Sequence, residues 1–427
     1  MADLVPRAIR ATLAPLGLYF RAGRHDRQAL LQIISEGKTS LNGIVFDACS
    51  DGLHGEVIQE LNSRRLETVF DSRAMELATL GGFAGPTGRL PWASDGPHAV
   101  SDLVGQAGVD FVGEIVNHVI SKGYSSVLSP SHFVQSADDP WLHIDALLTE
   151  QLRLQLDRAN ARSVPISYVL ALPRHVFCDD EQLSSILASI EHFPINALWL
   201  RVHPFGSDCS PNFLKAYIQA CRRLHSLQIP IVAERTNIAG LALIAFGAAG
   251  GIEAGITTFG EKFDASRLSR APKSNSGFQQ PPRVYVRDLA LSLARDEAES
   301  LLSLRQVRPF GCRDTRCCRM GIDDTISDPR RHFLLSRMDE VAALSRIPES
   351  VRASEYMERM LRPTTARLAR VLSLDLPEKL ASRLGTIQKR LTGWRYTLGA
   401  MLEQDAHPTF SPAPELRVSR PSQVARA

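Results

Sequence analysis

The chain has 427 residues, which is long enough for one large domain with an appendage or for two ordinary domains. Its 44% hydrophobic and 22% charged residues are typical of a soluble globular protein, and a net charge of +3 is too small to indicate a class of partner. No run of about 18 apolar residues occurs, so we expect no transmembrane helix and no membrane partner.

Short apolar runs alternate with helix-like patterns up to about residue 260. The predicted strands are Leu16–Phe20, Gly43–Phe46, Glu67–Phe70, Ser126–Leu128, Ile166–Leu172, Ala197–Val202, Ile229–Ala233 and Gly251–Thr257. Helical patterns such as Asp26–Glu36 and Pro211–Leu227 separate them, which indicates parallel pairing through right-handed crossovers. Residues 14–265 are therefore predicted to form a (β/α)8 TIM-type barrel. A doubly wound open sheet is the alternative, but the first turn lacks the Gly-x-Gly-x-x-Gly that would favour it.

Polar residues follow most of the predicted strands, and in a barrel these strand ends share one mouth, where active sites lie. Some of these side chains could instead form salt bridges that tie strand ends to loops. We predict that Asp47, Asp71 and Glu234 are catalytic, and that Arg21, Arg24, His25, His203, Arg235 and Glu253 bind the substrate.

Asp47 and Asp71 each end a Val-Phe-Asp segment on neighbouring strands. Carboxylates held this close raise the pKa of one member and can make an acid/base pair. The alternative is that each aspartate caps the helix that follows it.

Three regions follow the barrel. Residues 266–304 are predicted to be a loop and a linking helix, with the helical pattern over Asp288–Leu304. Residues 305–404 form a helical appendage with breaks at Pro363 and Pro377, and the Pro- and Ser-rich residues 405–427 are predicted to be a disordered tail.

The appendage contains a Cys-x4-Cys-Cys-x13-His pattern formed by Cys312, Cys317, Cys318 and His332. Three thiolates and an imidazole are the ligands of a tetrahedral structural Zn²⁺ site, so we expect zinc to staple the appendage. Buried thiols beside an unrelated histidine are the alternative. Arginines surround the cluster and could contact phosphate, or they could form a solvated face. Seven unevenly placed cysteines, and a start without an uninterrupted apolar core, predict a cytoplasmic protein.

Two segments resemble the tRNA-guanine transglycosylase superfamily, which includes enzymes that insert 7-deazaguanine into DNA. Thr68-Val69-Phe70-Asp71-Ser72, followed by Gly81-Gly82-Phe83, resembles the family's Thr-Asp-Ser-Gly-Gly-Phe-Gln. The segment Gly250–Ile256 is similar to Gly-Val-Asp-x-Phe-Asp. The family has a zinc-bearing subdomain after its barrel, with the pattern Cys-x-Cys-x-x-Cys and a distant His. The resemblance covers residues 40–350, and no motif is intact.

The resemblance implies base exchange at a glycosidic bond of tRNA or DNA. One carboxylate attacks the sugar and displaces guanine, while a second carboxylate handles a proton of the base. Asp71 matches the base-binding or proton-transfer carboxylate, but Ile256 stands where the family has its nucleophile. Glu253, Glu234 or Asp47 would have to replace it, or the exchange is lost.

Two other functions fit the same residues. The barrel could act on a small anionic metabolite with arginines as anion clamps, or it could be a non-catalytic protein of a larger system, for example in phage defence. The sequence predicts no oligomeric state.

Overall fold

The computed structural model describes residues 15–83, 85–256, 262–270, 282–405 and 408–415. Eight parallel strands close into a barrel in the order β1-β2-β3-β4-β5-β6-β8-β9, which confirms the predicted TIM-type fold. Their bounds are β1 Gly17–Arg21, β2 Gly43–Asp47, β3 Glu67–Asp71, β4 Ser126–Leu128, β5 Ile166–Pro173, β6 Ala197–His203, β8 Ile231–Ala233 and β9 Gly251–Gly255. The last strand ends before the predicted Thr257, which lies outside the described residues.

Alternate residues of each strand face opposite sides, because successive side chains of a strand point in opposite directions. One set fills the barrel interior, where the rings of Tyr19 and Trp199 lie 4.9 Å apart. The interior cluster consists of Tyr19, Val45, Val69, Leu128, Val169, Trp199 and Val232. The other set, including Phe20 and Phe46, packs against the surrounding helices.

The helices that cover the barrel are α1 Arg27–Ser35, α2 Gly55–Ser63, α4 Gln106–Lys122, α5 Pro140–Arg158, α7 Asp180–Ile190, α8 Pro211–Leu224 and α9 Asn237–Ala245, with short α3 Ala74–Leu77 and α6 Arg174–Phe177. Local signals set several starts. At α8, the Ser210 hydroxyl accepts a hydrogen bond from the Phe213 amide at 3.2 Å, and Pro211 occupies the first turn, where its missing N–H costs nothing.

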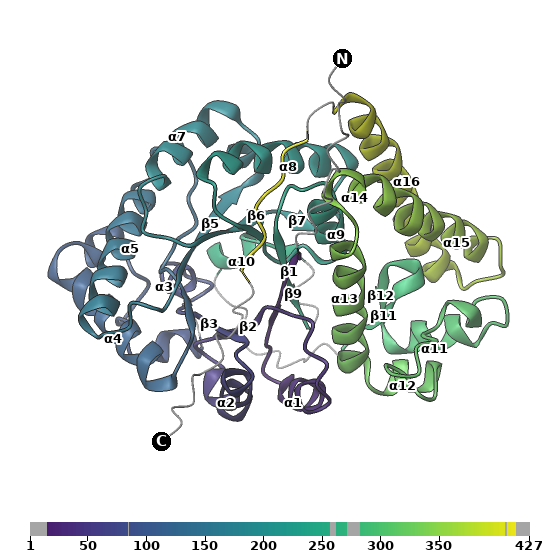
Figure 1. Ribbon diagram of the computed structural model, residues 1–427, viewed down its shortest axis with the longest axis horizontal. Coiled ribbons are helices and arrows are strands. Elements are labelled where there is room, and N and C mark those ends of the chain that lie inside the picture. Colours follow the sequence, from purple (N-terminus) through teal and green to yellow (C-terminus); the bar gives the residue numbers. More distant parts are fainter. Residues whose placement is uncertain (1–14, 84, 257–261, 271–281, 406–407, 416–427) are drawn as a thin grey trace, which may run out of the picture.

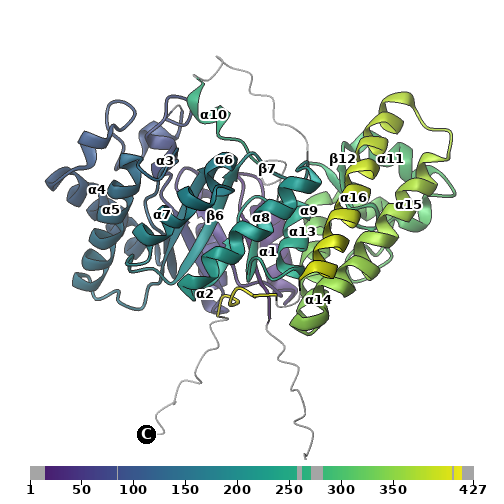
Figure 2. The same cartoon turned by 90° about the horizontal axis from the view of Figure 1, so that it is seen from above.

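A short antiparallel pair and one helical turn lie at the mouth of the barrel. β7 (Phe205–Gly206) pairs with β10 (Lys262–Phe263), and α10 (Ser266–Ser269) follows. Figure 2 shows α10 at one end of the barrel. The Gly81 amide donates to the Leu268 carbonyl at 2.8 Å, so the segment after β9 is tied to the loop after β3. The sequence did not predict this pair.

The region after the barrel begins with a hairpin, β11 (Val284–Val286) and β12 (Leu291–Leu293), and then α11 (Arg295–Ser303). The helix predicted over Asp288–Leu304 is therefore wrong in its first part, because Leu291 and Leu293 are buried in a strand. The remaining elements are α12 Ile322–Ser327, α13 Pro329–Ser345, α14 Glu349–Tyr356, a π-helical turn at Met357–Leu361, α15 Arg362–Leu372 and α16 Glu378–Gln404. Pro363 and Pro377 lie at the starts of α15 and α16, as the sequence indicated.

The appendage shares its hydrophobic core with the barrel. Leu334 of α13 and Leu398 of α16 belong to the same buried cluster as the outward-facing strand residues. The Trp394 indole donates to the Cys209 carbonyl at 3.0 Å, which joins α16 to the segment before α8. Figure 1 shows α15 and α16 on one side of the barrel, beside α13 and α14.

Residues 408–415 belong to the predicted disordered tail, but they lie extended across the end of the barrel opposite α10 (Figure 2). The Ser411 hydroxyl accepts a hydrogen bond from the Ile231 amide at 2.9 Å, and its own amide donates to the Gly247 carbonyl at 2.9 Å. A Cβ on Gly250 would lie 1.8 Å from the Pro412 carbonyl oxygen, so the close packing requires glycine there. Prolines and small polar residues fit this extended path, which hydropathy alone does not predict.

Within the described ranges, no helix combines the length and apolarity needed to span a membrane.

Candidate functional site

Arg21, at the end of β1, is the centre of a charged network at the barrel mouth. Its guanidinium lies 2.7 Å from Asp71 Oδ2, 2.9 Å from Glu234 Oε1 and 3.4 Å from Glu253 Oε1. These three carboxylates come from β3, the end of β8 and β9, because adjacent parallel strands deliver their last residues to one rim. The structure thus brings together four of the residues predicted from the sequence.

Arg201 of β6 is the second cation of the network. It contacts both oxygens of Glu234, with one Nη2–Oε1 distance of 3.1 Å, and lies 3.4 Å from Asp71 Oδ2. Burial opposes charge on Asp71 and Glu234, but the nearby Arg21 and Arg201 outweigh it and lower the pKa of both carboxyls. Asp71 and Glu234 are therefore anions at neutral pH.

The pKa of Glu253 is shifted in the opposite direction. Its side chain is 0% exposed, its nearest cation contact is the longer one to Arg21, and its Oε2 accepts a hydrogen bond from the Arg235 amide at 3.0 Å. Burial dominates and raises the pKa of Glu253, although the positive charge of Arg21 opposes it. The two buried glutamates of one network therefore have pKa values shifted in opposite directions.

Asp47 and Asp71 are register partners on β2 and β3, as predicted. Arg73 contacts both residues: its guanidinium binds Asp47, and its amide donates to Asp71 Oδ1 at 3.0 Å. Arg21 and Arg201 lower the pKa of Asp71, so Asp71 is not a member of the pair with a raised pKa.

Accessibility separates the four mouth carboxylates into two classes. The side chains of Glu234 and Glu253 are 0% exposed, whereas those of Asp47 and Asp71 are 15% and 10% exposed. Ile256, where the sequence resemblance would place a nucleophile, is 6% exposed. A ligand that enters the mouth therefore meets Asp47 and Asp71, while the glutamates hold the arginines in place.

Arg235 follows β8 in a left-handed backbone conformation with φ of 53°. Its guanidinium lies 5.8 Å from the centre of the Phe263 ring, and its Nε is buried without a hydrogen-bond partner in the described chain. Burial and the neighbouring Arg201 and Arg21 lower the pKa of Arg235 to about 10. This arginine could receive an anion at the mouth.

The other predicted binding residues lie farther from the network. His203 Nδ1 accepts a hydrogen bond from the Ala265 amide at 3.0 Å and lies 3.7 Å from Asp264 Oδ1, so it joins β6 to the segment after β10. Arg24 and His25 are exposed on the loop between β1 and α1. Neither residue shares the buried environment of Glu234 and Glu253.

The predicted metal ligands do come together in the appendage. Cys312, Cys317, Cys318 and His332 offer ligand atoms that all lie within 4.8 Å of one another. His332 Nδ1 is 3.3 Å from Cys317 Sγ and 3.4 Å from Cys318 Sγ, and the two sulfurs are 3.6 Å apart. Zinc bonds of about 2.3 Å to sulfur and about 2.0 Å to nitrogen place tetrahedral ligands roughly 3.5–3.8 Å from each other. The donor set and its spacing fit a metal ion.

The surroundings of His332 support the same function. Its Nε2 donates to the Tyr285 carbonyl of β11 at 2.9 Å, so Nδ1 is the ring nitrogen that faces the cysteines. Metal-binding histidines commonly fix their second nitrogen in this way. Hydrogen bonding within the group lowers the pKa of the Cys312 thiol and raises that of the Cys317 thiol.

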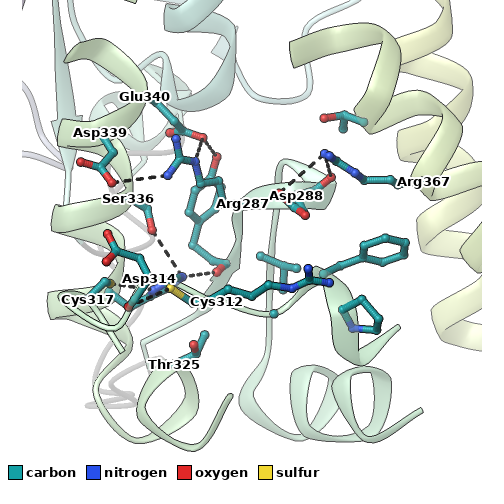
Figure 3. Close-up of a pocket in the computed structure, with 18 of the residues that line it drawn as sticks. Arg287, Asp288, Cys312, Asp314, Cys317, Thr325, Ser336, Asp339, Glu340 and Arg367 are labelled. Carbon is teal, nitrogen blue, oxygen red and sulfur yellow. Dashed lines mark hydrogen bonds and ion pairs between the residues drawn. The ribbon is translucent and has the colours of Figure 1, made fainter. Parts of the chain in front are cut away.

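A cleft of about 490 Å³ opens beside this group (Figure 3). Cys312, Cys317 and Asp314 lie at one end of the view, and Arg367 with Asp288 at the other. Its cations have acidic partners within the wall, for example Arg287 with Asp339 at 3.5 Å and Arg367 with Asp288 at 3.6 Å. The cleft is therefore close to neutral.

Sequence reasoning did not assign roles to two arginines of the mouth. Arg201 lies near the end of β6, two residues before His203, and that position was the available signal. Arg73 has φ of 64°, and its amide contact with Asp71 depends on this turn, which the sequence does not reveal.

The chain matches no protein-family model and no curated protein sequence. Among solved structures, it is similar to a 3-dehydroquinate dehydratase from Enterococcus faecalis, with 9% identity and a TM-score of 0.33 over 57% of this chain and 90% of that one. It is also similar to a GH26 beta-mannanase from Bacteroides ovatus, with 11% identity and a TM-score of 0.37 over 61% and 85% of the two chains. Such low similarities say nothing about activity, so the function has to be argued from the site.

Proposed function

We propose that this protein is a transglycosylase-like barrel enzyme that exchanges a guanine-type base at a glycosidic bond of tRNA or DNA. The observation that carries the proposal is the placement of Asp71. It is the residue that resembles the family's base-handling aspartate, and its side chain is 10% exposed, whereas Glu234 and Glu253 of the same arginine–carboxylate network are 0% exposed.

The charge state of Asp71 suits a guanine base. Arg21 and Arg201 keep the carboxylate ionised, so it can only accept hydrogen bonds. Guanine offers N1–H and a 2-amino group as neighbouring donors on one edge, which a carboxylate can accept together. Asp71 therefore binds and orients the base.

Asp47 is the carboxylate that we assign to the attack. It is the register neighbour of Asp71 and is more exposed than the two glutamates. Its oxygen would bond to the sugar C1′ while the C1′–N9 bond breaks and its electron pair leaves with the base. The departing guanine anion takes up a proton from solvent. The incoming base loses its N9 proton to solvent as N9 bonds to C1′ and releases the carboxylate, so the covalent intermediate divides one difficult substitution into two.

Zinc is the metal that we propose for the Cys3His group. Three sulfurs and one nitrogen fill a tetrahedral shell, so the ion would have a structural role and join the loop before α12 to α13. Cys317, Cys318 and His332 are at most 5% exposed, which agrees with a closed structural site.

The test is incorporation of labelled guanine or a labelled 7-deazaguanine into tRNA and into duplex DNA. The wild type should incorporate label into one of them, and Asp71→Asn and Asp47→Asn should each reduce the rate at least about 100-fold. Asp180→Asn is the matched control, because it removes a 75%-exposed carboxylate on the outer helix α7. Failure of the wild type to incorporate any base, or full activity of Asp71→Asn, would refute the proposal.

A small anionic metabolite is the second candidate substrate. The specific observation in its favour is Arg235, whose buried Nε makes no hydrogen bond within the described chain at the mouth. Thermal stabilisation by small phosphates or carboxylates, lost in Arg235→Gln and absent with tRNA or DNA, would support this function.

A further inference from the structure

A second cavity, of about 300 Å³, lies between the barrel and α16 and has an unusual lining. We call it the arginine pocket; it is lined by Ser207, Asn237, Ile238, Arg283, Ala290, Leu291, Ser292, Arg383, Thr386, Ile387 and Arg390. Three of these residues are arginines, three are hydroxyl residues, and none is an aspartate or glutamate. The cleft beside the Cys3His group differs, because four acidic residues, Asp288, Asp314, Asp339 and Glu340, line it with its arginines.

Arg390 of α16 is a cation of this pocket that has no hydrogen-bonded anion among the described residues. Its Nε is buried and makes no hydrogen bond within the described part of the chain. Burial lowers the pKa of Arg390, although the charge of Asp208 opposes this effect. Asp208 itself lies 2.9 Å from Lys262 Nζ and does not line the pocket. A bound anion would give this guanidinium the partner that it lacks.

Arg383 lies one helical turn before Thr386 on the same helix and is held in position. It donates to the Ser292 carbonyl at 2.8 Å and also contacts Glu297, which lies outside the pocket lining. A fixed arginine can bind a phosphate without losing much side-chain freedom, and its planar fork suits two phosphate oxygens. The hydroxyl of Ser207 adds a donor of the kind that contacts phosphates, whereas the hydroxyl of Thr386 already donates to the Ser382 carbonyl at 3.1 Å.

The pocket adjoins the barrel mouth through two loops that serve both sites. Ser207 follows β7, whose partner β10 carries the Phe263 ring that lies over Arg201 and Arg235. Asn237 begins α9 two residues after Arg235, so the positive end of a nine-residue helix faces the same region.

We propose that the arginine pocket binds a backbone phosphodiester of the nucleic-acid strand whose base enters the barrel mouth. This inference rests on the proposed function and names the contact that would distinguish a polynucleotide from a free base. The lack of acidic residues among the described lining residues, the partly buried Arg390 and the shared loops together carry it.

The test is binding of fluorescent tRNA and duplex DNA to the full-length protein, measured by anisotropy at several salt concentrations. Arg390→Gln should weaken binding about tenfold, the loss of one charge-assisted contact, and should reduce the salt slope by about one. Thr386→Glu places a carboxylate at an exposed position of the pocket. It should abolish the contribution of the pocket to nucleic-acid binding without disturbing the hydrophobic core. Lys389→Gln is the control, because it removes a neighbouring exposed charge outside the pocket.

Equal effects of Arg390→Gln and Lys389→Gln, or unchanged binding in Thr386→Glu, would overturn the inference. Inorganic phosphate could stabilise the wild type but not Arg390→Gln, while both proteins bind nucleic acid equally well. This result would overturn the inference in favour of a free phosphate ligand. The two proposals fail separately. If nucleic-acid binding depends on Arg390 but the wild type exchanges no base, only the proposed function is refuted. If Arg390→Gln exchanges the base with an unchanged KM for nucleic acid, only the proposed phosphate site is refuted.

Discussion

Replacement of Glu234 and of Glu253 by glutamine should have very different effects on stability, although both side chains are fully buried and contact Arg21. Glu234 gives its two oxygens to Arg21 and Arg201. Removal of this charge leaves two buried guanidiniums undercompensated, which typically costs about 3–5 kcal/mol. With an unfolding entropy of about 2.1 cal/mol/K per residue, the midpoint of thermal unfolding should then fall by roughly 3–6 °C.

Glu253→Gln should cost about 1 kcal/mol or less. The glutamine carbonyl can still accept the hydrogen bond from the Arg235 amide, and burial already raises the pKa of the native carboxyl toward its neutral form. Urea and thermal unfolding of both variants at pH 7, followed by circular dichroism, would measure the difference. Equal losses, or a larger loss in Glu253→Gln, would contradict the assignment of opposite electrostatic environments to the two glutamates.

Three further predictions concern acid stability, the metal group and the tail. The fold lowers the pKa values of Glu234 and Asp71, so these carboxylates stabilise the folded protein at pH values above their ordinary pKa of about 4. This stabilisation should be lost as the pH falls through their folded-state pKa values. In Glu234→Gln, the free energy of unfolding should therefore depend less steeply on pH in this range. Protein purified without a metal-affinity tag should contain about one zinc per chain, and elemental analysis should find it lost in Cys312→Ser but retained in Cys178→Ser, a cysteine outside the group. Ser411→Ala should destabilise by about 1–3 kcal/mol in urea unfolding, because it leaves the buried Ile231 amide without its acceptor; a change near zero would show that the tail does not hold the barrel end.

The barrel could be predicted from the sequence because eight short apolar runs alternate with helical patterns, and a closed parallel sheet is a common way to bury such strands. The strand ends also located Arg21, Asp71 and Glu234 at one rim, whereas Glu253 lies within β9 and was named only through the family resemblance. Which arginine pairs with which carboxylate could not be predicted. It depends on Arg73 and Arg201, whose side chains reach the mouth only through a left-handed turn and the barrel register.

In the regions outside the barrel, too, some features could be predicted from the sequence and others could not. The cysteine and histidine pattern was sufficient to predict that four ligands converge, because their residue types have few other reasons to cluster. The hairpin β11–β12 and the path of residues 408–415 depend on contacts with distant parts of the chain, such as Ser411 with Ile231. Local patterns carry no information about such contacts, so the helix predicted from Asp288 and the disorder predicted for these residues differ from the structure.

The most direct test of the proposed function is a search for the covalent intermediate. Protein incubated with tRNA or duplex DNA, without added base, should give a complex that survives denaturing electrophoresis, and mass spectrometry should place the sugar on Asp47. An adduct on Glu234 or Glu253 would contradict our choice of nucleophile, and absence of any adduct together with no release of guanine would contradict base exchange altogether.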